Sequence, residues 1–168
     1  QALESVCRWK KVRYTANDLA KKLAGYDTSR QEIGLLAQEI EKDYPEHVFL
    51  MMGLHPTHVN ENVKEELAFV KKWLDKRTFY AVGEIGIDLY WDKTFLKQQQ
   101  QAFKTQIQWA KEKNLPIVIH CRDAFDEIFE ILETEKDDKP YGIFHCFSGN
   151  LEQAKKAISY NMKLGIGG

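Results

Sequence analysis

The hydrophobic positions along the chain follow two patterns that alternate. Short continuous apolar runs lie at residues 48–54, 79–84, 116–120, 141–145 and 163–168. Apolar residues at helical spacing separate them, in residues 27–44, 63–74, 95–113, 125–132 and a last stretch after Asn150. Continuous apolar strands joined by amphipathic helices are typical of a parallel sheet covered by helices. The pattern therefore predicts an α/β fold.

The same pattern favours a partial (β/α) TIM-type barrel over an open nucleotide-binding sheet. No glycine-rich phosphate loop of the Walker or dinucleotide type is present in the sequence. A complete barrel has eight strands and about 250 residues, whereas 168 residues supply about five strands. We expect residues 27–168 to form a barrel domain truncated before its last strands, with residues 1–26 as an unfamiliar N-terminal segment.

Three of the predicted strands end on a side chain that metals bind. They end at Glu84, His120 and His145. The carboxyl ends of the strands in a parallel barrel meet at one rim, so residues far apart in sequence converge there. A carboxylate and two neutral imidazoles together suit a divalent cation. Taken alone, a carboxylate at such a position is more often part of an ion pair, and a histidine is more often a core residue hydrogen-bonded to the backbone.

Polar and aromatic residues close to these strand ends are candidates for substrate contact and catalysis. Arg122 suits a bidentate grip on a phosphate, and Asp123 suits the cap of the next helix. Asp88 shares strand parity with Glu84 if the strand continues, and there it would orient the rim loop or a water. Tyr90 and Trp91 suit stacking on a nucleobase or packing on the barrel rim, and the sequence leaves both open.

Composition and charge narrow the function only slightly. The formal net charge is −1, so a polyanionic substrate has to be held locally rather than by a basic surface. The basic run at residues 8–13 fits either DNA contact or an ordinary helical surface. No apolar stretch approaches the ~20 residues needed to span a bilayer, and no secretory signal opens the chain. Three cysteines without a framework fit the reducing cytoplasm. Strand alternation should turn Cys121 and Cys146 away from the neighbouring histidines.

Four segments in order resemble the TatD family of metal-dependent deoxyribonucleases. They are GLHP at 53–56, GEIGID at 83–88, IVIHCRDA at 117–124 and GIFHCFSG at 142–149. The resemblance implies a barrel hydrolase that cleaves the phosphodiester bonds of DNA, often from the 3′ end of single-stranded or frayed DNA, with a metal-activated water as nucleophile. It implies two divalent ions, which are Mg²⁺ or Mn²⁺, although two histidines also accept Zn²⁺. It places Glu84 as the bridging carboxylate, His120 and His145 on the second metal, and His55 beside the substrate.

Two features of the family pattern are missing from this sequence. No two histidines are separated by one residue, as in the family's first strand, and no late strand carries the family's aspartate ligand. A catalytically impaired form with a binding role, and a related amidohydrolase-like metal hydrolase, therefore stand as alternatives. We expect these 168 residues alone to hydrolyse DNA poorly compared with a form extended at both ends.

Overall fold

The computed structural model describes residues 30–90, 92–136 and 141–167, and the chain divides after Leu50 into two units. The first unit contains the helix α3 (Arg30–Asp43). The second contains the strands β1 (Met51–Met52), β2 (Ala81–Asp88), β3 (Ile117–Arg122), β4 (Gly142–Phe144) and β5 (Met162–Leu164), the short 3₁₀ helix η1 (Pro56–His58), and the helices α4 (Val63–Lys76), α5 (Leu96–Lys113), α6 (Phe125–Thr134) and α7 (Leu151–Ser159).

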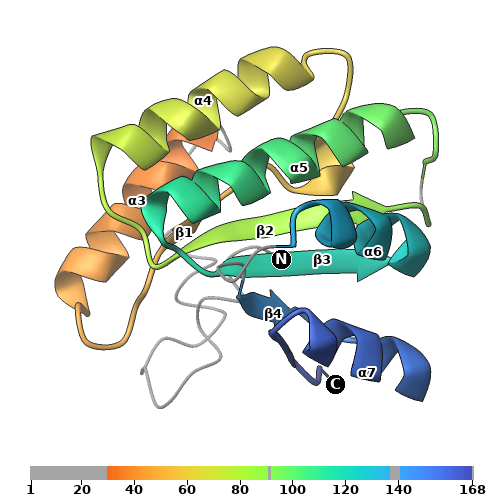
Figure 1. Ribbon diagram of the computed structural model, residues 1–168. Coiled ribbons are helices and arrows are strands. Elements are labelled where there is room, and N and C mark those ends of the chain that lie inside the picture. Colours follow the sequence, from red (N-terminus) through yellow and green to blue (C-terminus); the bar gives the residue numbers. More distant parts are fainter. Residues whose placement is uncertain (1–29, 91, 137–140, 168) are drawn as a thin grey trace. The chain divides into compact units, whose positions relative to one another are not determined.

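The five strands form one parallel sheet in the order in which they follow in the chain. This is the strand order of a (β/α) barrel that is not closed, as the apolar pattern predicted. The arrows of β2, β3 and β4 run in the same direction, so their carboxyl ends lie at one rim (Figure 1).

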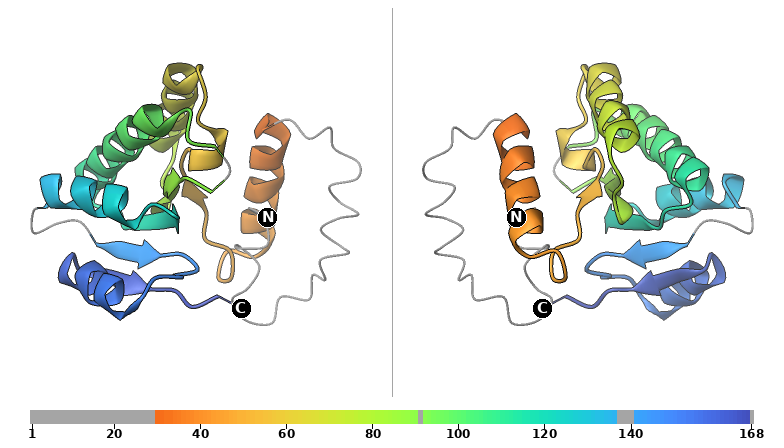
Figure 2. Two further views of the ribbon diagram at one scale, coloured as in Figure 1. Left: turned by 90° about the vertical axis from the view of Figure 1, so that its right-hand side faces the viewer. Right: turned by 90° about the vertical axis from the view of Figure 1, so that its left-hand side faces the viewer.

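The helices of the second unit cover one side of this curved sheet. Figure 2 shows α4, α5, α6 and α7 following the outside of its curve. Phe103 and Ile107 of α5 are fully buried, as are Ile85 and Ile87 of the underlying strand β2. Burial of such side chains stabilises the fold by about 1.5–3 kcal/mol each. Among the described residues, no helix is long and apolar enough to cross a membrane.

Local signals at the helix ends were predicted with mixed success. Asn114 adopts a left-handed conformation with φ of 53° and caps α5, as its position after Lys113 indicated. Asn150 and Gln153 form the predicted capping box of α7. The predicted cap at Asp123 is wrong, because the residue before α6 is Ala124 and Asp123 has a positive φ of 52°.

The strand β2 does not end at Glu84, as the sequence suggested, but continues for four more residues. Pairing with β3 shifts between Gly83 and Ile85, so Glu84 is an extra residue in a bulge. Gly86 follows with φ of 144°, and a Cβ at that position would lie 2.0 Å from the carbonyl oxygen of His120. A glycine is therefore required for the two strands to stay paired beyond the bulge.

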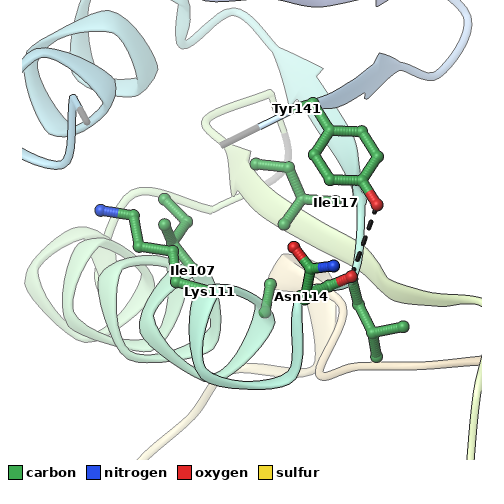
Figure 3. A pocket seen from close by; sticks show the side chains of 7 residues that line it. Ile107, Lys111, Asn114, Ile117 and Tyr141 are labelled. Atoms are coloured by element: carbon green, nitrogen blue, oxygen red, sulfur yellow. Dashed lines mark hydrogen bonds between the residues drawn. The ribbon is translucent and has the colours of Figure 1, made fainter. Parts of the chain in front are cut away.

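A small cavity lies at the other end of the sheet, where α5 ends and β3 and β4 begin (Figure 3). The Tyr141 hydroxyl donates a hydrogen bond to the carbonyl oxygen of Asn114 across it, at 3.4 Å. Its volume of about 10 Å³ is room for one water at most. The sheet is therefore closely packed at this point.

Candidate metal centre

Glu84, His120 and His145 come together at the carboxyl rim of the sheet. Glu84 Oε1 lies 2.8 Å from Nδ1 of His145 and 3.6 Å from Nδ1 of His120. His145 directly follows β4, and its backbone N–H donates to the carbonyl oxygen of Ile119 at 2.8 Å. The bulge directs Glu84 toward these imidazoles, because an extra residue changes the direction of a side chain. The structure thus brings together the three residues that the strand ends suggested.

Asp88 lies behind His120 and is nearly fully buried. Its Oδ2 is 2.8 Å from Nε2 of His120, and its Oδ1 accepts the backbone N–H of Tyr90 at 3.1 Å. A carboxylate on the far nitrogen of a histidine fixes the orientation of the ring and leaves the other nitrogen to face a cation. The Nδ1 of His120 is the nitrogen that faces Glu84.

His55 joins the same cluster from the loop after β1. One nitrogen or oxygen atom each of His55, Glu84 and His120 lies within 4.8 Å of the others, and the rings of His55 and His120 meet edge to face at 4.4 Å. The Nδ1 of His55 accepts the backbone N–H of Thr57 at 3.3 Å and lies 2.8 Å from the Thr57 hydroxyl. A neutral ring that accepts at Nδ1 carries its proton on Nε2.

The carboxylates and imidazoles of this cluster shift one another's pKa values. Burial alone would raise the pKa of Glu84, but the adjacent His120 and His145 outweigh it and lower that pKa. Burial opposes a charge on His120, yet Glu84 and Asp88 together raise its pKa. Burial, together with the nearby His120, lowers the pKa of His55 to about 4. The two carboxylates therefore favour positive charge at His120, and His55 stays neutral.

Two buried glutamines of α5 hold the segments that carry these residues, and the sequence reasoning missed both. The side-chain amide of Gln106 accepts the N–H of Leu54 at 2.6 Å and donates to its carbonyl oxygen at 3.3 Å. The side-chain amide of Gln99 accepts the backbone N–H of Asp88 at 2.9 Å and donates to the Asp88 carbonyl oxygen at 3.2 Å. The available signal was that both glutamines lie on the helical face of Phe103 and Ile107.

Arg122 and Tyr90 lie beside the cluster, at the ends of β3 and β2. The guanidinium carbon of Arg122 lies 3.7 Å from the centre of the Tyr90 ring. Trp91 and the basic run at residues 8–13 lie outside the described residues.

The two cysteines that follow the histidines differ in their surroundings. Cys121 is turned into the protein as strand alternation predicts, and burial raises the pKa of its thiol to about 12. The same expectation is wrong for Cys146, whose Sγ lies 3.7 Å from Nε2 of His145. The reason is that β4 ends at Phe144 and Cys146 has a positive φ of 48°, so alternation no longer applies.

The donor set fits a divalent cation. Glu84, His120 and His145 supply a hard oxygen and two borderline nitrogen ligands at one rim, and the Glu84 carboxylate provides negative charge that a cation offsets. A partial (β/α) barrel with such a cluster at the carboxyl ends of its strands defines the class of barrel metal hydrolases.

Comparison with known proteins identifies the family of the chain. Residues 9–168 match the family described as TatD related DNase, and the chain belongs to that family. The match begins inside the segment 1–26, which the sequence motifs left unassigned.

Individual relatives agree with the family. The chain is 37% identical over 132 residues to the uncharacterized metal-dependent hydrolase YabD of Bacillus subtilis. The aligned part is 79% of this chain and 51% of YabD. It is 28% identical to the 3′-5′ ssDNA/RNA exonuclease TatD of Pantoea ananatis, with the same coverage. The crystal structure of the TatD homologue YjjV from Escherichia coli superimposes with a TM-score of 0.69 at 30% identity, covering 77% of this chain and 50% of YjjV. The chain thus spans about half the length of the relatives it matches.

Proposed function

We propose that this chain provides the second-metal side of a TatD-type phosphodiesterase that removes nucleotides from the ends of single-stranded DNA, at a site for two divalent ions. The observation that carries the proposal is the convergence of His120 and His145 on one oxygen of Glu84. The relatives named as single-stranded exonucleases support the substrate class. Mg²⁺ or Mn²⁺ suits a phosphate substrate, and Zn²⁺ suits the histidines.

In this proposal Glu84, His120 and His145 would hold the cations, and the Glu84 carboxylate would supply the negative charge between the two imidazoles. Bound divalent ions would supply an activated water and offset the charge that develops on the phosphate. Asp88 keeps His120 in the orientation that presents Nδ1. It is a positioning residue in this role.

His55 and Arg122 are assigned to the substrate rather than to the metals. Because Nδ1 of His55 accepts from Thr57 and the ring is neutral, its Nε2–H is available as a donor to a phosphate oxygen. Arg122 is exposed and carries a guanidinium that pairs with phosphate oxygens. Both donors lie at the rim where the scissile phosphate would meet the cations.

The proposal is tested by metal binding and hydrolysis on the same preparations. Mn²⁺ affinity is measured by calorimetry, and cleavage is followed on a 3′-labelled single-stranded oligodeoxynucleotide with Mg²⁺ or Mn²⁺. We expect Glu84→Gln to weaken Mn²⁺ binding at least 100-fold and to abolish cleavage, because it removes the charge shared by both histidines. Glu112→Gln, at an exposed position of α5, is the matched control and leaves both unchanged.

The extended form of the protein belongs in the same assay, where we expect it to cleave faster than the 168 residues alone. Mn²⁺ binding that survives Glu84→Gln would contradict the proposed centre. Cleavage of a p-nitrophenyl carboxylic ester with no cleavage of DNA, by both forms, would instead favour the amidohydrolase-like alternative.

A further inference from the structure

Tyr90 and Arg122 form a stacked pair at the rim of the candidate centre. Tyr90 follows the end of β2 and its side chain is 53% exposed. Arg122 ends β3 and is also exposed, and its guanidinium lies over the Tyr90 ring at 3.7 Å. Stacking on a ring uses one face of the guanidinium and leaves its edge donors directed sideways. Two exposed residues, one aromatic and one cationic, thus lie with their planes in contact at the rim.

The pair is held in place by the residues that orient the candidate centre. Asp88 accepts the N–H of Tyr90 with one oxygen and contacts Nε2 of His120 with the other. The carbonyl oxygen of Arg122 accepts the N–H of Leu89 at 3.0 Å, and Asp88 and Arg122 are partners in the register of β2 and β3. The stacked surface is thus fixed relative to His120 by one buried carboxylate.

We propose that the Tyr90–Arg122 pair is a stacking platform for the base of the terminal nucleotide, whose phosphate lies at the candidate centre. This inference rests on the proposed function and names the residues that would recognise the nucleotide. Each further base–aromatic stack contributes a sequence-tolerant gain in binding, because every base has a π face. Arg122 would act twice, stacking with its face and contacting a phosphate with its edge.

The spacing along the strand fits a nucleotide. Arg122 lies two residues beyond His120, which is about 7 Å along a parallel strand. A base reaches such a platform only when it is not stacked in a duplex, so the platform selects single-stranded or frayed ends. With a net charge of −1, the chain has no general attraction for polyanions, and a local platform of this kind would supply the contact.

The test is a binding measurement that does not require turnover. The full chain is titrated by calorimetry, in Mg²⁺, with deoxyadenosine monophosphate and with deoxyribose 5-phosphate, which lacks the base. We expect the wild type to bind the nucleotide about 10-fold more tightly. Tyr90→Leu removes that preference without changing the affinity for deoxyribose 5-phosphate, whereas Tyr90→Phe, the matched control, keeps it.

Arg122→Lys is a second test at the same site, because it keeps the positive charge but removes the planar guanidinium that stacks on Tyr90. We expect it to reduce the preference for the base several-fold. Equal affinity of the wild type for both ligands would overturn the platform, as would a preference that survives Tyr90→Leu and Arg122→Lys. A preference for the base, with no metal-dependent cleavage of DNA by either the 168 residues or the extended form, supports the platform and overturns the proposed function. Metal-dependent cleavage of DNA without a preference for the nucleotide over deoxyribose 5-phosphate supports the proposed function and overturns the platform.

Discussion

Side-chain amides, rather than the candidate ligands, set the positions of the residues beside the centre. Gln106 and Gln99 of α5 pair with the backbone of Leu54 and Asp88 in the way that a neighbouring strand would. Both are almost completely buried, so their hydrogen bonds have no competition from water. Neither glutamine contacts a candidate ligand side chain directly, and both act through the backbone that they hold.

Gln106→Leu tests this role. The substitution leaves the N–H and C=O of Leu54 without their partner, so we expect the free energy of unfolding to fall by about 1–3 kcal/mol. The loop that carries His55 should also loosen, and affinity for deoxyribose 5-phosphate should fall while Mn²⁺ affinity changes less. Gln108→Leu, at an exposed position on the same helix, is the control. Unchanged urea denaturation of Gln106→Leu would contradict this account.

The candidate ligands were predictable from sequence because each ends or interrupts an apolar run. Glu84, His120 and His145 have that signal, and the structure brings all three together. His55 has the same signal, because it directly follows the apolar run at residues 48–54, and one of its nitrogens lies close to Glu84 and His120. Gln99 and Gln106 share the helical face of the apolar residues Phe103 and Ile107, but only the structure shows which backbone groups they bind.

Gly86 is a residue that leaves the sequence little freedom to change. Its φ of 144° disfavours any side chain, and a Cβ would meet the His120 carbonyl oxygen at 2.0 Å. We expect Gly86→Ala to lower the free energy of unfolding by more than about 3 kcal/mol, measured by urea denaturation. Gly165→Ala, where the nearest atom to a Cβ lies 3.0 Å away, should cost less. Equal costs at the two positions would show that the backbone at Gly86 relaxes.

At the scale of elements, the bulge in β2 is the main departure from the predicted pattern. The residues after Glu84 looked like a loop because glycine and aspartate interrupt the apolar run. They remain a strand because Ile85 and Ile87 are fully buried and the pairing with β3 resumes after one extra residue. The extension carries Asp88 to the side of His120, and so it places part of the candidate centre.

The helices α6 and α7 are linked by a hydrogen bond whose strength depends on pH. The Tyr160 hydroxyl, just after α7, donates to Glu133 of α6. Burial and this bond raise the pKa of Tyr160 to about 12, and the bond lowers the pKa of Glu133. A raised pKa on the tyrosine gives stability that is lost as pH rises from 10 toward 12. A lowered pKa on the carboxyl gives stability that is lost as pH falls below its ordinary value of 4.5.

Thermal melts of Tyr160→Phe across pH check this link. We expect the wild type to melt at a higher temperature than the variant, with the largest difference between about pH 5 and pH 10 and a smaller one on either side. Tyr80→Phe, at an exposed tyrosine, serves as the control. A difference in Tm that is constant from pH 3 to pH 11 would assign the effect to packing rather than to the hydrogen bond.

At the scale of the whole molecule, the order of strands and helices in residues 51–168 was largely predictable from the apolar pattern. Continuous apolar strands can be satisfied only by burial on both faces, which a parallel sheet with covering helices provides. The lengths of the strands were less predictable. The run at residues 48–54 yields only the two-residue strand β1, because pairing with β2 extends over Met51 and Met52 alone.

The near-neutral charge of the molecule predicts how the proposed binding of DNA responds to salt. If the candidate centre and Arg122 make one or two phosphate contacts, the logarithm of the affinity should fall with the logarithm of salt with a slope of about −1. Fluorescence anisotropy of a labelled single-stranded oligonucleotide between 50 and 200 mM salt measures this slope. A slope several times steeper would assign a larger part of the binding to cations elsewhere, with the basic run at residues 8–13 as the first candidate.

Gln99 and Gln106 are seven positions apart in α5, and this separation fixes how the helix is aligned with the sheet. They span about two turns, so both amides reach the sheet from one side. A single residue inserted between them would rotate one amide by about 100° and detach either the loop of His55 or the end of β2. Surface helices usually tolerate small changes in length. In α5 such a change would disturb two segments of the rim at once, because Gln106 holds Leu54 and Gln99 holds Asp88.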